Sequence, residues 1–278
     1  MEKLEQLESL LRAMGGCLVA YSGGVDSAFL ACVAHRVLGE ASVAVLADSP
    51  SLPRSELNEA VALAERFGFP LEVIKTLEFE NEAYLTNPPN RCYFCKHALF
   101  EAMEALAAAR GVPFLLYGEN MDDLGDVRPG AQAAAQFQVR APLKEAGLTK
   151  AEIRALSAHL GLPTADKPQM ACLSSRIPHG ERVTPAKLTQ IEQAEQHLRS
   201  LGFHDVRVRH HELSQGALAR IEIGPDEMSR CMEWATRQQL VEKFQALGYQ
   251  QVTLDLIGYR RGSLNPSSST SIVRDQHA

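Results

Sequence analysis

The sequence has neither a long apolar run nor the usual start of a secreted protein. No stretch approaches the roughly 20 consecutive apolar residues that a membrane-spanning helix needs. Residues 1–16 are acidic and amphipathic, whereas a secretory signal peptide begins with basic residues followed by an apolar segment. We therefore expect a cytoplasmic protein with no membrane partner.

The sequence also lacks an excess of positive charge. Its net charge is −6 over 278 residues, so it has no broad electrostatic footprint for nucleic acid, and we expect no nucleic-acid partner. A hydrophobic content of 45% and a charged content of 22% are ordinary for a globular protein. The length permits one large domain or two smaller ones.

Helix and strand patterns alternate through the first half of the chain. Helices are expected at residues 5–14, 28–37, 55–67, 96–109 and 149–160, and strands at 17–21, 43–47, 71–75 and 114–117, with loops at 118–130 and 166–180. Ser55 is the expected N-cap of the third helix and Gly68 its C-terminal stop. Strands separated by helices predict an α/β fold with a parallel sheet covered on both faces.

The pattern changes from Thr184 onward. A helix at 185–201, strands at 205–210 and 219–223, a helix at 225–247 and a strand at 251–259 predict a smaller C-terminal α+β domain. The boundary is expected near Gly180, which gives domains at residues 1–180 and 181–264. Residues 265–278 are rich in serine and are expected to form a mobile tail.

A glycine-rich segment joins the first strand to the second helix, with the sequence Ser22-Gly23-Gly24-Val25-Asp26-Ser27. Its glycines allow a tight turn, and successive N–H groups beside a helix N-terminus favour phosphate oxygens. Asp26 beside anions indicates a bridging Mg²⁺ ion. The alternative is a simple turn with capping side chains. Neither a Walker A ending nor GxGxxG is present. Asp48 ends the second strand, at the edge where such folds bind nucleotides.

Six cysteines in a reducing compartment are free thiols, metal ligands or catalytic groups. Cys17, Cys32 and Cys231 lie in apolar patterns and are expected to be buried. Cys92 and Cys95 form a CxxC pair, and Cys172 lies in the loop 166–180. Three thiolates could hold a [4Fe–4S] cluster with one iron open, or a histidine could complete a zinc site. Three unrelated thiols are the remaining alternative.

The phosphate loop resembles the SGGxDS loop of the PP-loop ATP pyrophosphatases, and the wider chain resembles the LarE family of sulfur transferases, which act in nickel-pincer nucleotide cofactor biosynthesis. The resemblance covers nearly the whole chain. The segments that carry it are Ser22–Ser27, Arg91–Lys96, Asp122–Gly130, Pro142–Leu143, Gly147–Arg154, Asp166–Pro168, Ala171–Pro178, Arg207–His211, Ala219–Glu222 and Gly258–Arg260.

This resemblance implies a reaction. With Mg²⁺, ATP adenylylates a carboxylate of pyridinium-3,5-dicarboxylate mononucleotide and releases pyrophosphate, and sulfur then displaces AMP to leave a thiocarboxylate. In one type of member, the cysteine matching Cys172 gives up its own sulfur. In the other, three cysteines hold a [4Fe–4S] cluster with an extra sulfide, supplied as free sulfide or by a partner. Cys92, Cys95 and Cys172 match the second type. The family also implies a homo-oligomer, a hexamer.

Further site residues follow from the same resemblance. Arg207 and Arg209 alternate along one strand and so share a face, and both are candidates to bind the substrate phosphate. Ordinary surface ion pairs are the alternative for both arginines. The other candidates are Ser175 and Arg176 near Cys172, Lys96 for neutralising negative charge, and Glu195 and Asp226 as acidic groups near the active cysteine. A solvated helix face is the alternative for these last two.

Three other functions remain in competition. A tRNA-thiolating PP-loop enzyme would share the adenylylation chemistry, although the acidic net charge argues against it. Amide-forming PP-loop ligases need no cysteine trio. A non-catalytic module that only binds ATP would release no pyrophosphate.

Overall fold

The computed structural model describes residues 2–123 and 129–260, so the predicted tail at 265–278 lies outside the described residues. The chain divides into two compact units, one of residues 1–85 and 89–171 and the other of residues 86–88 and 172 onward. The predicted boundary at Gly180 falls inside the second unit, because the preceding loop is held there. Asn87 donates to the carbonyls of Ile177 and Pro178, at 3.2 and 2.7 Å.

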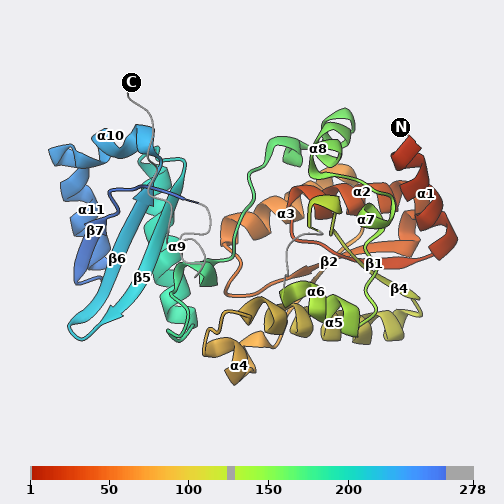
Figure 1. The fold of residues 1–278 in the computed structure, drawn as a ribbon, viewed down its shortest axis with the longest axis horizontal. Helices are drawn as coiled ribbons and strands as arrows, with labels where there is room; N and C mark the ends of the chain where they lie inside the picture. The colour runs from red at the N-terminus through yellow and green to blue at the C-terminus, as the bar shows by residue number, and fades with distance from the viewer. Residues whose placement is uncertain (1, 124–128, 261–278) are drawn as a thin grey trace. The chain divides into compact units, whose positions relative to one another are not determined.

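The first unit is built on a four-stranded parallel sheet in the order β3-β2-β1-β4 (Figure 1). Its strands are β1 (Cys17–Ala20), β2 (Ser42–Ala47), β3 (Leu71–Ile74) and β4 (Phe114–Tyr117). The predicted parallel sheet is thus confirmed. Because all strands run the same way, their carboxyl ends meet at one edge, and the loops that follow them gather there.

Helices cover both faces of this sheet. They are α1 (Glu2–Met14), α2 (Val25–Leu38), α3 (Arg54–Phe67), α4 (Glu82–Leu85), α5 (Arg91–Arg110), α6 (Pro129–Gln136), α7 (Pro142–Glu145) and α8 (Lys150–His159). Alternate β1 side chains enter two separate cores: Cys17 and Val19 pack with α1, α2 and α3, while Leu18 and Ala20 pack with α5 and α6. Among the described residues, no helix is both long enough and apolar enough to span a membrane.

Several helix ends follow the expected sequence signals, and others do not. Thr149 caps α8 in a capping box with Glu152, and Gly68 ends α3 in a left-handed conformation with φ of 69°. The predicted Ser55 cap is wrong, because α3 begins at Arg54, directly after Pro53. The predicted start of α5 at Lys96 is also wrong, because α5 begins at Arg91 and the CxxC pair lies in its first turns.

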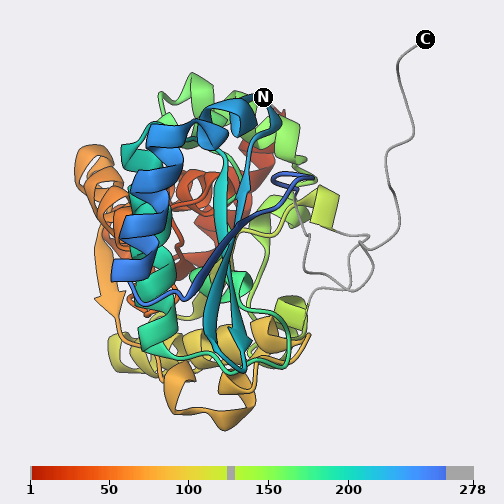
Figure 2. The same ribbon diagram turned by 90° about the vertical axis from the view of Figure 1, so that its left-hand side faces the viewer.

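The second unit contains a three-stranded sheet in the order β5-β6-β7 (Figure 2). Its elements are α9 (Pro185–Ser200), β5 (Val206–Leu213), β6 (Gly216–Ile223), α10 (Met228–Met232), α11 (Trp234–Ala246) and β7 (Gln251–Leu254). The predicted helix at 225–247 is broken at Glu233, whose extended backbone separates α10 from α11. Strands β5 and β6 are antiparallel, and β7 pairs in parallel with β6.

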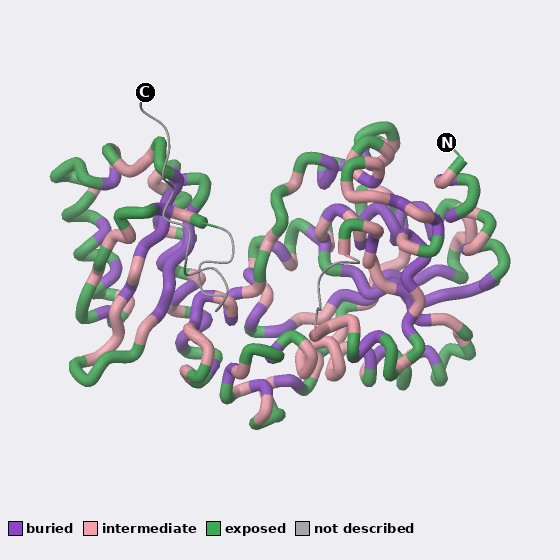
Figure 3. The backbone as a smooth tube through the Cα atoms, in the orientation of Figure 1, coloured by how far each residue is buried: buried purple, intermediate pink, exposed green. Residues whose placement is uncertain are grey.

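One face of this second sheet packs on α9 and α11, with Val206, Val208 and Ile221 in the shared core. Figure 3 shows the resulting buried stretches of β5 and β6. Because side chains alternate along a strand, Arg207, Arg209 and Glu222 face away from that core. The second unit therefore presents a polar face of its sheet.

Candidate functional site

The loop between β1 and α2 has the geometry that phosphate binding needs. Gly23 has φ of +70°, and a Cβ there would lie 2.8 Å from the Cβ of Ala60. Ser27 Oγ accepts from the N–H of Ser22 at 3.1 Å and donates to the carbonyl of Gly24 at 3.2 Å. The loop is therefore fixed in shape, and the N-terminus of α2 follows it directly.

A cavity of about 230 Å³ opens at this loop. Its lining includes Ser22, Gly24, Asp26, Ser27 and Lys96. Lys96 arrives from α5, so the structure brings this predicted residue to the predicted loop. Burial lowers the pKa of the Lys96 ammonium, and Cys95 and Cys92 partly oppose that effect. A lysine in this position can interact with developing negative charge in the cavity.

Two residues without a predicted role hold Asp26. The ammonium of Lys150 pairs with one carboxylate oxygen, and Asn120 donates to the other at 3.2 Å. Lys150 is the first residue of α8, which the Thr149 cap starts at that point. The segment Gly147–Arg154 was part of the family resemblance, but nothing in its spacing indicated a contact with the phosphate loop.

Gly118 lies against the phosphate loop from the end of β4. A Cβ there would sit 3.0 Å from the amide nitrogen of Ser27 and 3.1 Å from the Cβ of Asp26. A larger residue would push the loop aside. Asp48, by contrast, directly follows β2, forms an ion pair with Arg54 and is not among the residues that line the cavity.

The cysteines separate into two groups by exposure. Cys17, Cys32 and Cys231 are buried as predicted, and burial raises the pKa of Cys17 to about 11. Cys92 is exposed, and Cys95 and Cys172 are partly exposed. Cys92 and Cys95 lie three residues apart on α5, on one side of the helix. Within either unit taken alone, the described residues hold no group of three His, Cys, Asp or Glu side chains suited to a metal.

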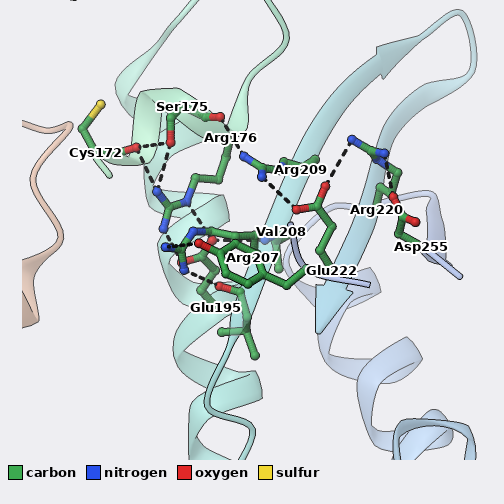
Figure 4. Close-up of polar contacts among 12 residues, drawn as sticks. Cys172, Ser175, Arg176, Glu195, Arg207, Val208, Arg209, Arg220, Glu222 and Asp255 are labelled. Carbon is green, nitrogen blue, oxygen red and sulfur yellow. Dashed lines mark hydrogen bonds and ion pairs between the residues drawn. The ribbon is translucent and has the colours of Figure 1, made fainter. Parts of the chain in front are cut away.

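A buried ion pair anchors the polar face of the second unit (Figure 4). Arg176 donates through Nε and Nη2 to both carboxylate oxygens of Glu195, at 2.8 and 3.0 Å, and the two side chains are 0% and 1% exposed. The amide of Val208 donates to the same carboxylate at 3.1 Å. The alternative that placed Glu195 on a solvated helix face is wrong. Despite its burial, the nearby Arg176 lowers the pKa of Glu195.

The same arginine fixes the backbone at Cys172. Arg176 Nη1 donates to the Cys172 carbonyl at 3.0 Å, and Ser175 Oγ donates to that carbonyl at 2.7 Å. Figure 4 shows the sulfur of Cys172 directed away from these contacts. The short helical turn Leu173–Arg176 therefore holds the backbone of Cys172 while its side chain stays partly exposed.

Arg207 is buried without a carboxylate on its guanidinium. It is 8% exposed, donates to the Val206 carbonyl at 2.7 Å and to the Tyr259 hydroxyl at 3.4 Å, and stacks over the Tyr259 ring at 4.9 Å. Burial and the charge of Arg176 lower the pKa of Arg207, and the nearby Glu195 carboxylate only partly opposes them. Burying an unpaired charge is costly, so this position favours an anionic ligand.

Arg209 is also buried, but it is paired. It donates to Glu222 at 2.8 Å and to the Ser175 carbonyl at 2.9 Å. Arg220, opposite Arg209 in the β5–β6 register, shares Glu222 at 3.4 Å and pairs with Asp255 at 2.8 Å. The surface-ion-pair alternative for Arg207 and Arg209 is therefore wrong.

Arg220 and Glu222 had no predicted role, although their alternation along a strand could have indicated one shared face. The structure does not bring Asp226 into this network. Asp226 is exposed in the turn Pro225–Glu227 and makes no hydrogen bond or ion pair with other described residues. The second unit thus gathers six of the predicted residues: Cys172, Ser175, Arg176, Glu195, Arg207 and Arg209.

Several known proteins are similar to this chain in sequence. The NAD synthase family matches residues 5–87. The chain is 34% identical, over 95% of its length and 94% of the relative's, to pyridinium-3,5-bisthiocarboxylic acid mononucleotide synthase of Lactiplantibacillus plantarum. It is 46% identical, over 95% of its length and 97% of the relative's, to an uncharacterized protein of Synechocystis. A subunit of the glutamine-hydrolyzing GMP synthase of Methanopyrus kandleri is 27% identical over 68% of this chain and 65% of its own.

Proposed function

Because this chain belongs to the LarE family of PP-loop sulfur transferases, we propose that it activates a carboxylate of pyridinium-3,5-dicarboxylate mononucleotide with ATP and replaces AMP with sulfur. The Lactiplantibacillus relative is a pyridinium-3,5-bisthiocarboxylic acid mononucleotide synthase, which supports this substrate class. The product would be a thiocarboxylate. The observation that carries the proposal is Arg207, a buried cation with no ion-pair partner among the described residues, on the polar face of the second unit.

In the first unit, the phosphate loop would bind ATP. The backbone N–H groups of Gly23 and Gly24 and the Ser22 hydroxyl would donate to phosphate oxygens, while the Ser22 N–H and the Ser27 hydroxyl hold the loop in shape. The Asp26 carboxylate lines the cavity and suits Mg²⁺, which takes oxygen ligands and would neutralise phosphate charge. Lys96 would add positive charge near the adenylate. Asp48, held by Arg54, is proposed only as a contact to adenosine at the sheet edge.

In the second unit, Arg207 and Arg209 would bind the substrate phosphate. Arg207 would gain an anion at ion-pair distance, and stacking on the Tyr259 ring would fix the orientation of its guanidinium. Ser175 lies beside both Arg176 and Arg209, and its hydroxyl would donate to the substrate phosphate only by giving up its bond to the Cys172 carbonyl. Asp226 stays a candidate acidic group near the cysteine, without a contact to support it.

Arg176 and Glu195 have a different proposed role. The guanidinium of Arg176 is committed to Glu195 and to the Cys172 backbone, so we propose that this pair positions Cys172. The pair is nearly inaccessible to solvent, which fits a positioning role better than direct binding of a ligand.

For the sulfur source, we propose a [4Fe–4S] cluster on Cys92, Cys95 and Cys172. These thiols fit because they are the exposed or partly exposed cysteines, and thiolates are the usual ligands of such clusters. When bound, the cluster would carry the transferable sulfide at its open iron, reloaded by sulfide or a sulfur-supplying partner. The alternative is donation of the Cys172 sulfur itself. We also propose a cytoplasmic homo-oligomer, a hexamer by family resemblance.

A product assay tests the reaction. The protein is incubated with Mg²⁺, ATP and the pyridinium dicarboxylate mononucleotide, and the nucleotide products are separated. We expect AMP and pyrophosphate, with formation dependent on the mononucleotide. Release of ADP and phosphate, or no product beyond a control without the mononucleotide, would contradict the proposed function.

A second experiment distinguishes the two sulfur sources. The protein is purified anaerobically, its iron and sulfide are measured, and the intact mass is taken after one turnover. A cluster predicts bound iron, several turnovers with added sulfide, and Cys172 at full mass. Loss of one H₂S per chain at Cys172, with product never exceeding enzyme, would establish the sacrificial route and leave the sulfur-transferase assignment intact.

A further inference from the structure

A lysine outside the proposed site fixes the segment that leads to Cys172. Lys167 follows the short helical turn Pro163–Asp166, and its ammonium pairs with Glu56 at 2.6 Å and Glu59 at 2.9 Å, both on α3. The side chains of Lys167 and Glu56 are only 15% and 11% exposed. Partial burial strengthens this pair relative to an ordinary surface ion pair.

The backbone of the same segment is held from another helix. Arg154 of α8 donates to the carbonyl of Ala165 and, at 2.8 Å, to the carbonyl of Lys167. A cavity of about 660 Å³ lies beside this segment, and its lining includes Gly23 of the phosphate loop, Glu56, Glu59 and Leu63 of α3, and Lys167 itself. Side chains do not fill the space beside this segment. The segment therefore depends on specific polar contacts to hold its position.

The helix that binds Lys167 also supports the phosphate loop. The Tyr21 hydroxyl donates to the Ala60 carbonyl at 3.0 Å, and Gly23 packs against the Cβ of Ala60 with no room for a side chain. Glu56, Glu59 and Ala60 are spaced i, i+3 and i+4, so they share one side of α3. One side of a single helix thus contacts both the ATP loop and the segment preceding the sulfur-site cysteine.

We propose that Lys167 is a positioning residue for sulfur transfer. Its pairing with Glu56 and Glu59 sets the course of the chain that leaves the first unit toward Cys172, five residues further on in the sequence. None of the three ion-pair residues lines the 230 Å³ cavity that holds Asp26 and Lys96, so we expect the pair to act on sulfur transfer through the backbone of its own segment. This inference rests on the proposed function. It predicts that Lys167 matters for sulfur transfer but not for adenylylation.

The test compares those half-reactions in Lys167→Met. Adenylylation is followed by substrate-dependent exchange of labelled pyrophosphate into ATP, and sulfur transfer by the rate of thiocarboxylate formation. We expect exchange within about two-fold of wild type and transfer lower by about ten-fold or more, because misplacing a reacting group has effects of this size. Lys167→Arg should restore most of the transfer rate.

Two further variants separate positioning from stability. Lys167→Met combined with Glu56→Gln removes the buried, unpaired carboxylate, so it should fold stably and still transfer sulfur slowly. Lys3→Met is the matched control, since Lys3 pairs with Glu152 at 2.7 Å but both side chains are more than 40% exposed, and it should change neither rate.

Equal losses of exchange and transfer in Lys167→Met, or no loss of either, would overturn the inference. A wild-type protein that exchanges no pyrophosphate would instead overturn the proposed function on which it rests. Failure of the inference is therefore seen in the Lys167→Met variant, and failure of the proposed function is seen in the wild-type protein.

Discussion

The phosphate loop of the first unit and the arginine–carboxylate network of the second unit handle charge in opposite ways. At the loop, backbone N–H groups are the proposed donors to phosphate. The charged pair of Asp26 and Lys150 is 20% and 30% exposed. In the network, Arg176 and Glu195 are 0% and 1% exposed, and Glu222 is fully buried. Charge in the first site is available for chemistry, whereas much of the charge in the second site is structural.

The difference has an energetic consequence. Removing one partner of a partly exposed pair changes stability little, because water solvates the remaining charge. Removing one partner of a buried pair leaves a charge that neither protein nor water compensates. Function and stability should therefore separate at Asp26 and be coupled at the Arg176–Glu195 pair.

The largest expected effect is the loss of activity in Asp26→Ala. Without this carboxylate, the cavity loses its proposed Mg²⁺ ligand, and we expect adenylylation to be abolished. The free energy of unfolding should change by less than about 1 kcal/mol, since the Lys150 pair is partly exposed. Pyrophosphate exchange and urea unfolding measure the two quantities. A large loss of stability would mean that Asp26 stabilises the fold as strongly as the buried carboxylates of the network do.

Glu195→Ala should instead cause a large loss of stability. It leaves Arg176 buried without its carboxylate, and breaking a buried pair in this way costs about 3–5 kcal/mol. Urea unfolding measures the change, with Gln193→Ala on the exposed side of α9 as the control. A loss of less than about 1 kcal/mol, similar to that of the Asp26 variant, would remove the distinction between the two sites.

Arg207→Ala should affect substrate binding more than stability. Losing a charge-assisted and desolvated contact costs about 1.5–3 kcal/mol, which corresponds to a ten- to hundred-fold higher KM for the mononucleotide. The KM for ATP should stay constant. Arg237→Ala is a close control, because Arg237 also stacks on an aromatic ring, Trp234, at 5.0 Å, but is exposed. Unchanged mononucleotide KM values in both Arg207→Ala and Arg209→Ala would exclude these residues from the site.

The smallest effect concerns pH. Burial, with a contribution from Lys187, lowers the pKa of His210 from 6.5 to about 4. The unfolded chain then binds more protons than the folded one between those values, so this contribution to stability is complete above about pH 6.5 and is lost as the pH falls toward 4. Urea unfolding from pH 7 to 5 should show a shallower decline for His210→Gln than for wild type. His204→Gln, at an exposed position, should follow wild type, and identical slopes in all three proteins would contradict the assignment.

Much of the fold could be predicted because its signals are local. Buried parallel strands appear as short apolar runs, and the Thr149 capping box and Gly68 mark helix ends directly. The start of α5 was missed although Asn90, a residue type favoured at N-caps, directly precedes Arg91; its side chain makes no capping hydrogen bond. The break at Glu233 was missed because no proline or glycine marks it.

The sequence by itself determined the phosphate loop, because its donors and its turn lie within six adjacent residues and depend on backbone geometry. It also indicated that Arg207 and Arg209 share a strand face. Only the tertiary structure decided which charges meet. Lys150 reaches Asp26 across 124 positions and Arg176 reaches Glu195 across 19, while Arg207 has no such partner among the described residues. The energy of a charge depends on its distance to other charges and on its exclusion from water, and neither quantity is encoded at a fixed spacing in the chain.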